Sequence, residues 1–452
     1  MIAYTTTLYK DLKLKKSFGL WSAIFLGIGS MVGAGIFVLL GQAGAIAGNL
    51  VWISFILGGL IALSAGYSLA KLAGTYPSRG GIVEYLVQCY GKGIFSGSIS
   101  ILFYLSSIVG ITMVTKTFGV YAAHMLGEST PFLVNLYSIG ILTTFVIINL
   151  AGSSMIAKSE NIIVITKLII ISTFTIIVFF YIKPELLSLE NTPQFNNIFF
   201  AVSLTFFAYA GFNVIANTAE DIENPKETMM KAMIYSILIV MVLYIAVTFA
   251  VFGNLSLNEI IEAKDYALAQ AAYPVFGQIG FTIMAVAALI STASAINANL
   301  YATTNITYQM AKNGDLPKIY EKGVWHSTEG LVVSAILIAM MILFFDLGEI
   351  ATMGSLYILF IHLFVHTGHF FRIKHTKASK VIIAFAIFSI LTTIILALIY
   401  TSKHLDGIGY YIVGGFAISF AIEIILRLTT NREIKKQIKF NNNFLKIFKD
   451  EN

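Results

Sequence analysis

The sequence predicts an all-α polytopic membrane protein with about 12 transmembrane helices. Hydrophobic residues make up 57% of the 452 positions and only 12% are charged, whereas a soluble domain carries about 25% Asp, Glu, Lys and Arg. The charged residues stand in short clusters between apolar runs, most of them of about 18–26 residues, the length that crosses a hydrocarbon core. Because backbone groups in lipid must pair within their own segment, we expect runs of this length to be helices.

Twelve such runs follow one another along the chain. The least distinct boundary is a short polar turn at 346–349, between the ninth and tenth runs. The longest polar stretches are about 20–30 residues, so we expect no soluble catalytic domain and no enzyme activity. The predicted spans are 20–46, 50–73, 96–124, 132–151, 161–182, 198–219, 229–253, 276–310, 330–346, 348–371, 381–401 and 407–427.

The basic residues predict how the chain crosses the membrane. Of the 29 Lys and Arg residues, 24 lie in the N-terminal segment 1–19, in the tail from Arg427, or in the even-numbered connections and the span ends beside them, where Lys71 and Lys231 lie. By the positive-inside rule both termini are cytoplasmic, in a cell (inner or plasma) membrane. The positive net charge therefore reflects topology and does not indicate a nucleic-acid partner. Apolar residues among the bases of the tail favour a helix lying on anionic lipid, and a solvated tail fits equally well.

The first span is rich in glycine. The stretch "GIGSMVGAGIF" at 27–37 holds four glycines, and each glycine in a helix interior costs about 0.5–1 kcal/mol relative to alanine. The sixth span, "FFAYAGFNVIANTAED" at 206–221, has a glycine near its middle and then turns polar. Paired interruptions in corresponding helices of two inverted repeats are typical of a transporter's midplane site.

A broken helix exposes backbone groups that suit a zwitterion. N–H groups at one half-helix start carry partial positive charge, and C=O groups at the other half's end carry partial negative charge. An amino acid's carboxylate and ammonium match that pair of ends. Close helix packing through a GxxxG pair is the alternative interpretation of the first stretch. A nucleotide loop is excluded because no strand precedes the glycines.

Four stretches in order resemble the amino acid–polyamine–organocation (APC) superfamily of transporters. They are "GSMVGAGIF" (29–37), "YPSRGGIVEYLVQCYG" (76–91), "FFAYAGFNVIANTAEDIENPKET" (206–228) and "ISTASAINANLYATTNITYQMAKNGDLP" (290–317). The resemblance implies two inverted five-helix repeats, 20–182 and 198–372, with discontinuous helices 1 and 6. Helices 11 and 12 (381–427) would lie outside them, followed by the basic cytoplasmic tail 428–452.

The resemblance also implies where the substrate binds, between helices 1, 3, 6 and 8. The carboxylate would meet backbone N–H groups around Ala34, and the ammonium would meet carbonyls of the first and sixth spans. An aromatic residue at Phe207 closes over the substrate in related carriers. The implied substrate-binding residues are Met31, Gly33, Ala34, Gly35, Phe207, Ala210, Gly211 and Asn213.

Two positions depart from the family pattern. Some members place a serine where this chain has Ala34, so a hydroxyl contact to the carboxylate is missing here. Many members have an acidic residue where this chain has Asn213. Polyamines and arginine would favour a carboxylate near their distal cation, so an amino acid with a neutral side chain fits better.

Lys167 interrupts the apolar fifth span, within "IIVITKLIII". A charge in the membrane costs at least about 2.5–3.5 kcal/mol on insertion scales, so such residues are usually functional. Proton-coupled members of the family have a lysine at this place, which implies that Lys167 exchanges a proton during the cycle. The alternative is a lysine that reaches the surface by snorkelling.

Other charged and titratable residues also lie in or near the spans. His362, His366 and His369 share one face of the tenth span. They could relay protons or bind a metal, but cations near a helix C-terminus are the simpler interpretation, and we predict no metal site. For Lys116 in the third span, the outer surface and the outer vestibule both remain open.

The loop after the sixth span carries a cluster of acidic residues. Glu220 and Asp221 could pair with a base such as Arg79 or Lys10 to close a cytoplasmic gate, and a solvated acidic turn is the alternative. Together these features predict a proton-coupled amino acid symporter that needs no cofactor. An amino acid exchanger is the alternative within the transporter class. A channel would need a repeated filter and an enzyme would need a converging catalytic set, and neither is evident.

Overall fold

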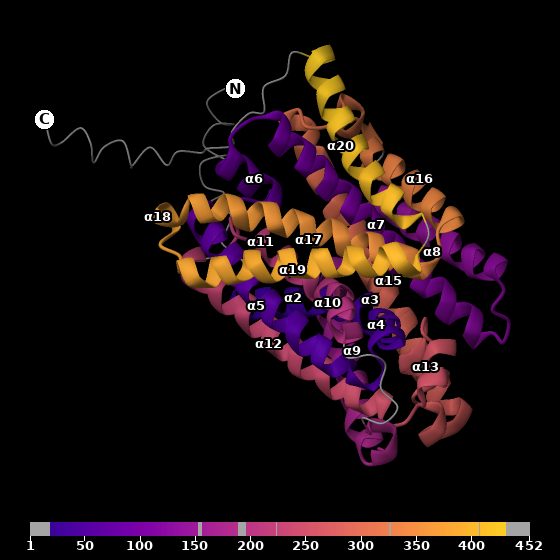
Figure 1. Ribbon diagram of the computed structural model, residues 1–452. Helices are drawn as coiled ribbons and strands as arrows, with labels where there is room; N and C mark the ends of the chain where they lie inside the picture. The colour runs from indigo at the N-terminus through magenta and orange to yellow at the C-terminus, as the bar shows by residue number, and fades with distance from the viewer. Residues whose placement is uncertain are drawn as a thin grey trace, which may run out of the picture.

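The computed structural model describes residues 19–151, 156–188, 196–222, 224–324, 327–405 and 407–430. Within these ranges the chain is helical apart from its connections and one short antiparallel ribbon, β1 (Gly323–Val324) paired with β2 (Ser327–Thr328). Figure 1 shows long helices packed side by side, with the last two, α19 and α20, drawn in yellow and orange. Residues 431–452 of the predicted tail and nearly all of the N-terminal segment lie outside the described residues.

The first five predicted spans are helices separated by short connections. The first span is divided among three helices, and α6 lies in the connection after the second span. The elements are α2 (Leu20–Met31), α3 (Ala34–Phe37), α4 (Leu39–Ala47), η1 (Gly48–Leu50), α5 (Val51–Thr75), α6 (Ile82–Tyr90), α7 (Ile94–Met125), α8 (Pro131–Ala151), α9 (Ile156–Phe179) and η2 (Pro184–Leu187).

The remaining spans follow in the predicted order. The eighth span, α15, is longer than expected because it includes a kink at Gly277, whose φ of 62° lies in the left-handed region that glycine tolerates. The elements are α10 (Asn196–Tyr209), η4 (Ala210–Phe212), α11 (Asn213–Ala216), α12 (Pro225–Phe252), α13 (Leu257–Glu262), α14 (Ala267–Gln270), α15 (Tyr273–Asn313), η5 (Lys318–Glu321), α16 (Glu329–Phe344), α17 (Leu347–Phe371), α18 (Ile373–Thr376), α19 (Lys380–His404) and α20 (Ile408–Thr430).

The predicted ninth span is shorter than a full membrane crossing. In the described part of the chain, 11 helices are long and apolar enough to cross a membrane, and α16 is an additional apolar helix of 16 residues. That length rises only about 24 Å, against about 30 Å of hydrocarbon. The helix ends because Phe345 is extended and Asp346 caps the next helix, its carboxylate accepting from the Glu349 N–H at 2.8 Å.

The two predicted interruptions differ in kind. In the first span, Val32 leaves the helical region (φ −81°, ψ 74°) between α2 and α3, which is an unwound turn. In the sixth span the backbone tightens to the 3-10 helix η4 and keeps helical dihedral angles through Phe212 and Asn213. The interruption of the sixth span is therefore a 3-10 turn rather than the open break we expected, because its backbone keeps helical dihedral angles where the first span unwinds.

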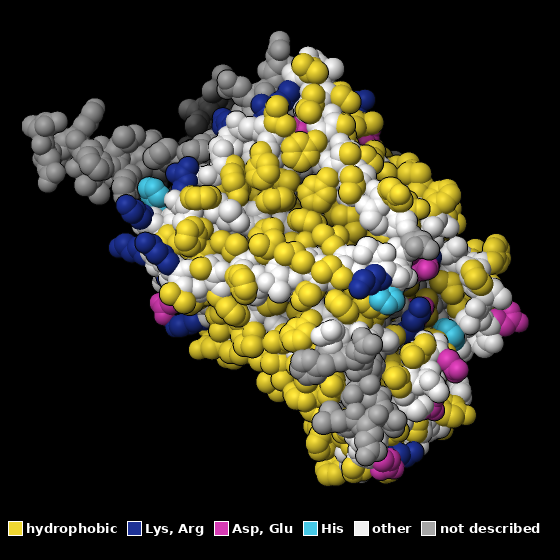
Figure 2. Space-filling model, in the orientation of Figure 1, with side chains coloured by type: hydrophobic (Ala, Val, Ile, Leu, Met, Phe, Trp, Pro, Cys, Tyr) yellow, Lys and Arg dark blue, Asp and Glu magenta, His cyan; other side chains and the backbone are white. Residues whose placement is uncertain are grey.

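The helices pack into one bundle whose outer surface is apolar. The pairs α5 and α12, and α7 and α15, pack closely, and α2 lies against α12 while α10 lies against α5. Figure 2 shows hydrophobic side chains over most of the visible face, with charged side chains mainly toward its margins. Large side chains such as Val381, Ile279 and Phe344 are exposed on the outside of the bundle. An exposed apolar surface of this extent suits contact with lipid.

Candidate functional site

The two interrupted spans touch each other through their backbones. A Cβ added to Gly211 would lie 2.6 Å from the backbone N of Met31 and 2.6 Å from the carbonyl carbon of Ser30. A Cβ added to Gly35 would lie 2.8 Å from the carbonyl oxygen of Ala208. Contacts this short exclude a side chain, so both glycines are needed for the spans to meet.

Tyr244 on α12 bridges the two interruptions. Its hydroxyl is fully buried and lies 2.7 Å from the Met31 carbonyl oxygen, to which it donates, and 3.3 Å from the Ala208 carbonyl oxygen. The Met31 carbonyl also accepts from the Gly33 N–H at 2.9 Å. Both lone pairs of this carbonyl are thus engaged, and the predicted ammonium contact at Met31 requires one donor to leave.

Neighbouring helices also satisfy other carbonyls of the first span. Ser291 on α15 donates to the Val32 carbonyl at 3.2 Å, and Tyr121 on α7 donates to the Phe37 carbonyl at 2.8 Å. The last carbonyls of a helix have no partner within it, and burial without a partner is costly. Side chains from the surrounding bundle therefore satisfy carbonyls at the interruptions on both sides of α3.

Lys167 lies at the first interruption rather than at the surface. Its side chain is 2% exposed, and its Nζ donates to the Gly29 carbonyl at 2.8 Å. The helices α2 and α9 are close at this point, because a Cβ on Gly29 would lie 2.7 Å from Val164 Cγ2. The snorkelling interpretation is therefore wrong: the ammonium points into the bundle, near the middle of α9.

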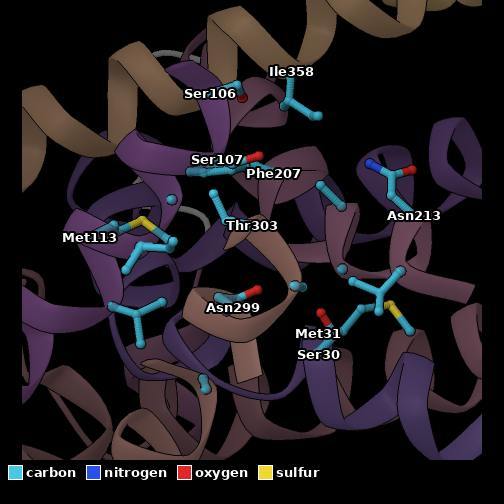
Figure 3. A pocket seen from close by; sticks show the side chains of 18 of the residues that line it. Ser30, Met31, Ser106, Ser107, Met113, Phe207, Asn213, Asn299, Thr303 and Ile358 are labelled. Atoms are coloured by element: carbon cyan, nitrogen blue, oxygen red, sulfur yellow. The ribbon is translucent and has the colours of Figure 1, made fainter. Parts of the chain in front are cut away.

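A cavity of about 160 Å³ lies where the interrupted spans meet α7 and α15 (Figure 3). Its lining comes from α2, α3, α6, α7, α10, η4, α11, α15 and α17. Among the described residues that line it, none is Asp, Glu, Lys, Arg or His. The polar side chains that line it are Ser30, Ser106, Ser107, Asn213, Asn217, Asn299 and Thr303.

The polar side chains of the cavity include several that sequence reasoning missed. Figure 3 shows Asn299 and Thr303 of α15 between the first span and α7. Ser107 already donates to the Phe103 carbonyl at 3.0 Å. The Asn213 side-chain oxygen is buried with no hydrogen-bond partner, so it is an acceptor available to a ligand. For the lining residues other than Asn213, the only signal in the sequence was that small polar residues stand within apolar spans.

Most predicted binding residues meet at this cavity. The lining includes Met31, Gly35, Phe207, Ala210, Gly211 and Asn213. Gly33 does not line it directly, but a Cβ there would meet only the Ala295 Cβ, at 3.5 Å, and Ala295 is a lining residue. Ala34 is the first residue of α3. Six of the eight residues predicted to bind substrate therefore line one cavity in the fold.

The predicted gate residues form an ion pair at one end of the bundle, which we call the Arg79 end. Arg79 Nη2 lies 2.6 Å from Asp221 Oδ1, and Arg79 Nε lies 3.7 Å from Glu220 Oε2. The hydrogen bond to Asp221 raises the pKa of the Arg79 guanidinium. All three side chains are exposed, so the pair contributes little stability. Lys10, the other predicted partner, lies outside the described residues.

The opposite end, which we call the Asp265 end, is closed by polar contacts. Gln42 of α4 donates to Asp265, in the connection between α13 and α14. Burial raises the pKa of the Asp265 carboxyl above its ordinary value. Lys116, for which the sequence left two positions open, lies at this end of the bundle. Its ammonium donates to the carbonyls of Ile342, at 2.9 Å, and Phe345. It therefore stabilises the C-terminal end of α16.

The three histidines of α17 are not surface cations at a helix end, as the simpler interpretation held. His362, His366 and His369 are all fully buried and hydrogen-bonded to one another or to neighbouring hydroxyls. Helical spacing put them on one face, but it could not show that this face points inward. Within the described ranges no three His, Cys, Asp or Glu side chains are arranged to hold a metal ion.

Comparison with known proteins extends the resemblance along the chain. The amino acid permease family matches residues 18–418. The inner membrane transport protein YbaT of Escherichia coli (strain K12) is 33% identical over 91% of this chain and 96% of its own length. The serine/threonine exchanger SteT of Bacillus subtilis (strain 168) is 30% identical over 68% of this chain and 71% of its own length. The aspartate–proton symporter of the same organism is 26% identical over 69% of this chain and 64% of its own length.

The family match spans most of the chain and includes both interrupted helices. The helices of the described residues accordingly form a permease fold of this superfamily, built for transport across a membrane and not for enzymatic chemistry. The chain is a multi-pass integral membrane protein that belongs to the amino acid permease family of the APC superfamily.

Proposed function

We propose that the protein is a secondary transporter that carries amino acids with neutral side chains by alternating access, in symport with protons. The observation that carries the proposal is the uncharged cavity at the meeting point of the two interrupted spans. An uncharged lining would not compensate the cost of burying a charged side chain. A cavity of about 150 Å³ holds one benzene-sized group, which favours small and medium side chains.

The charged ends of the substrate would use the backbone. The first N–H groups of α3, from Ala34 onward, have no partner within their helix and would bind the carboxylate. The ammonium would bind carbonyls of Phe207 and Ala210 in the sixth span, and the Met31 carbonyl after Tyr244 releases it. The unpartnered oxygen of Asn213 would bind a polar group of the substrate.

Alternating access would use the two inverted repeats, 20–182 and 198–372. Packing is consistent with this symmetry. The first helix of each repeat (α2 or α10) packs against the second helix of the other repeat (α12 or α5). The Arg79 end would be cytoplasmic, as the basic connections indicate, and the ion pair of Arg79 with Asp221 and Glu220 would be a cytoplasmic gate. Gln42 and Asp265 would close the outer side.

Lys167 would couple the proton to the substrate. Its ammonium binds the Gly29 carbonyl, two residues before α2 ends. Loss of the proton would weaken that contact, since a neutral amine donates less strongly than an ammonium. The first interruption would then be free to rearrange. Exchange without ion coupling is the second candidate, because the relative SteT is an exchanger of serine and threonine.

Uptake into proteoliposomes tests the proposal. A panel of labelled neutral, acidic and basic amino acids would be offered to the wild type, Lys167→Ala and Lys183→Ala, an exposed lysine after the same helix that serves as control. Inward gradients of protons and of sodium and internal unlabelled amino acid would be compared as driving forces.

Proton-driven uptake of neutral amino acids by the wild type and Lys183→Ala, but not by Lys167→Ala, is the expected result. Uptake that needs only internal amino acid would replace symport by exchange. Sodium dependence would refute the role of Lys167. A preference for acidic or basic amino acids would refute the neutral cavity as the side-chain site.

A further inference from the structure

A continuous hydrogen-bonded chain runs through the bundle beside the substrate cavity. His362 Nδ1 lies 3.1 Å from His366 Nε2, and His366 Nδ1 lies 2.8 Å from the Ser68 hydroxyl of α5. The same hydroxyl lies 2.7 Å from His369 Nδ1, and His369 Nε2 lies 2.8 Å from the Thr376 hydroxyl of α18. We call these five residues the histidine chain.

The hydrogen bonds assign one direction to the histidine chain. The Thr376 hydroxyl donates to the Ile373 carbonyl at 3.3 Å, so it accepts from His369 Nε2–H. Each imidazole carries one N–H when neutral, and the pattern then continues backward: Ser68 donates to His369, His366 donates to Ser68, and His362 donates to His366. Every donor has an acceptor. The reverse direction would leave a buried N–H on His362, which is rarer than an unpaired acceptor.

The histidine chain ends on a bare nitrogen beside the sixth span. His362 Nε2 is buried with no hydrogen-bond partner. The imidazole of His362 packs against Phe206 of α10 and Phe212 of η4, with ring centroids 5.4 and 5.6 Å away. Ile358, one turn earlier on the same face of α17, lines the cavity. The unpaired nitrogen thus lies next to the interrupted segment that would move with substrate.

The other end of the histidine chain approaches the surface of the Arg79 end. Thr376 is buried, but its neighbours His375 and Lys377 are exposed. His362 lies nine residues before the end of α17, or about 14 Å along the axis. The histidine chain therefore spans the distance between the interrupted sixth span and one face of the bundle.

We infer that the histidine chain is a proton-transfer path that leads from the sixth span to the Arg79 end, separate from Lys167. A proton that binds His362 Nε2 makes an imidazolium, which passes its Nδ1 proton to His366 Nε2. His366 then passes its Nδ1 proton to Ser68 as Ser68 passes its own to His369 Nδ1. His369 passes its Nε2 proton to the Thr376 hydroxyl as that hydroxyl turns from the Ile373 carbonyl and gives its own proton to solvent water at the Arg79 end, so one proton enters and one leaves.

The charged and titratable groups around the histidine chain suit transfer rather than storage of the proton. The Lys71 ammonium of α5 repels a positive charge on His369. On α6, Cys89 and Tyr90 pack against α17 at Gly368. No carboxylate of the described residues is hydrogen-bonded to the histidine chain. A positive charge therefore has no stabilising partner along the path.

Ser68→Ala tests the inference with little change in packing, because it removes only the bridging hydroxyl. Ser64→Ala is the matched control: it lies one turn away on α5, and its hydroxyl bonds only the Ile61 carbonyl of its own helix. Since the inference rests on the proposed proton coupling, two transport modes are compared in proteoliposomes. These are proton-driven uptake and exchange of labelled for unlabelled neutral amino acid.

We expect Ser68→Ala to lower proton-driven uptake at least tenfold while exchange stays within twofold of the wild type, and Ser64→Ala to change neither. Proton-driven uptake by Ser68→Ala within twofold of the wild type would overturn the path and leave symport intact. Exchange by the wild type without any proton flux would overturn both the path and symport, while amino acid transport would stand.

NMR of purified, 15N-histidine-labelled protein tests the histidine chain independently of transport. Protonated and bare imidazole nitrogens give distinct signals, so the neutral protein should show one N–H on each of the three buried histidines. Ser68→Ala should shift the signals of His366 and His369, and Ser64→Ala should not. If Ser68→Ala leaves these signals unchanged, the histidine chain does not exist and the inference fails, whatever the protein transports.

Discussion

Replacing Tyr244 by phenylalanine should tighten substrate binding while it weakens the substrate-free fold. The hydroxyl donates to the Met31 carbonyl at 2.7 Å and approaches the Ala208 carbonyl at 3.3 Å. The Met31 carbonyl would keep its bond from the Gly33 N–H, so Tyr244→Phe removes one buried hydrogen bond, worth about 0.5–1.5 kcal/mol, and the melting temperature without substrate should fall. If the ammonium must displace this hydroxyl, its removal abolishes a competing bond worth about 0.5–1.5 kcal/mol. Binding should then tighten about 2- to 12-fold.

Tyr209→Phe is the matched control for this prediction. Tyr209 is also fully buried and its ring lies 5.1 Å from that of Tyr244, but its hydroxyl donates to the Phe55 carbonyl of α5. The assay combines thermal melting in detergent with the dissociation constant of a transported amino acid. Weaker binding by Tyr244→Phe, or the same gain in both variants, would refute the competition at the Met31 carbonyl.

Three further substitutions test the spans and both ends of the bundle. Gly211→Ala should abolish uptake because its Cβ would lie 2.6 Å from Met31 N. The control Gly409→Ala, whose Cβ would have nothing within 4 Å, should transport normally. Equal uptake by the two variants would contradict the close approach of the spans. Arg79→Ala should change the melting temperature little, since an exposed ion pair contributes about 0–1 kcal/mol. It should nevertheless speed the chemical labelling of a cysteine placed in the cavity, and an unchanged labelling rate would argue against a gate. Burial raises the pKa of the Asp265 carboxyl above its ordinary 3.8, so its contribution to stability is present at low pH and lost as pH rises through the raised value. The melting temperature of Asp265→Asn should therefore rise relative to that of the wild type as the pH increases above about 4. A difference between the two melting temperatures that does not change with pH would contradict this prediction.

The position of the site could be predicted because its cause is local. Glycines such as Gly33, Gly35 and Gly211 are costly within a span unless the backbone needs them. Gly35 and Gly211 lie at the contact between the interrupted spans, and Gly33 faces Ala295 of α15 beside the cavity. The form of the second interruption could not be predicted. Whether Gly211 opens the helix or tightens it to a 3-10 turn depends on how closely α2 approaches, which no single span encodes.

The partners across helices could not be predicted, because they join residues far apart in the chain. Ser68 lies about 300 residues from the histidines it bridges, and helical spacing on α17 gave no sign of which helix would face them. The same holds for the contact of Tyr244 with Met31. It also holds for Lys116, whose partner carbonyls can accept its hydrogen bonds only because α16 ends early.

The most direct test of the central claim is the substrate preference of Asn213→Asp. The claim is that an amino acid side chain occupies the uncharged cavity where the interrupted spans meet. A carboxylate in place of the unpartnered amide oxygen should turn the preference from neutral toward basic amino acids by at least about tenfold. Asn258→Asp, exposed at the Asp265 end, should keep the wild-type preference. An unchanged ranking of amino acids in Asn213→Asp would show that substrate binds elsewhere.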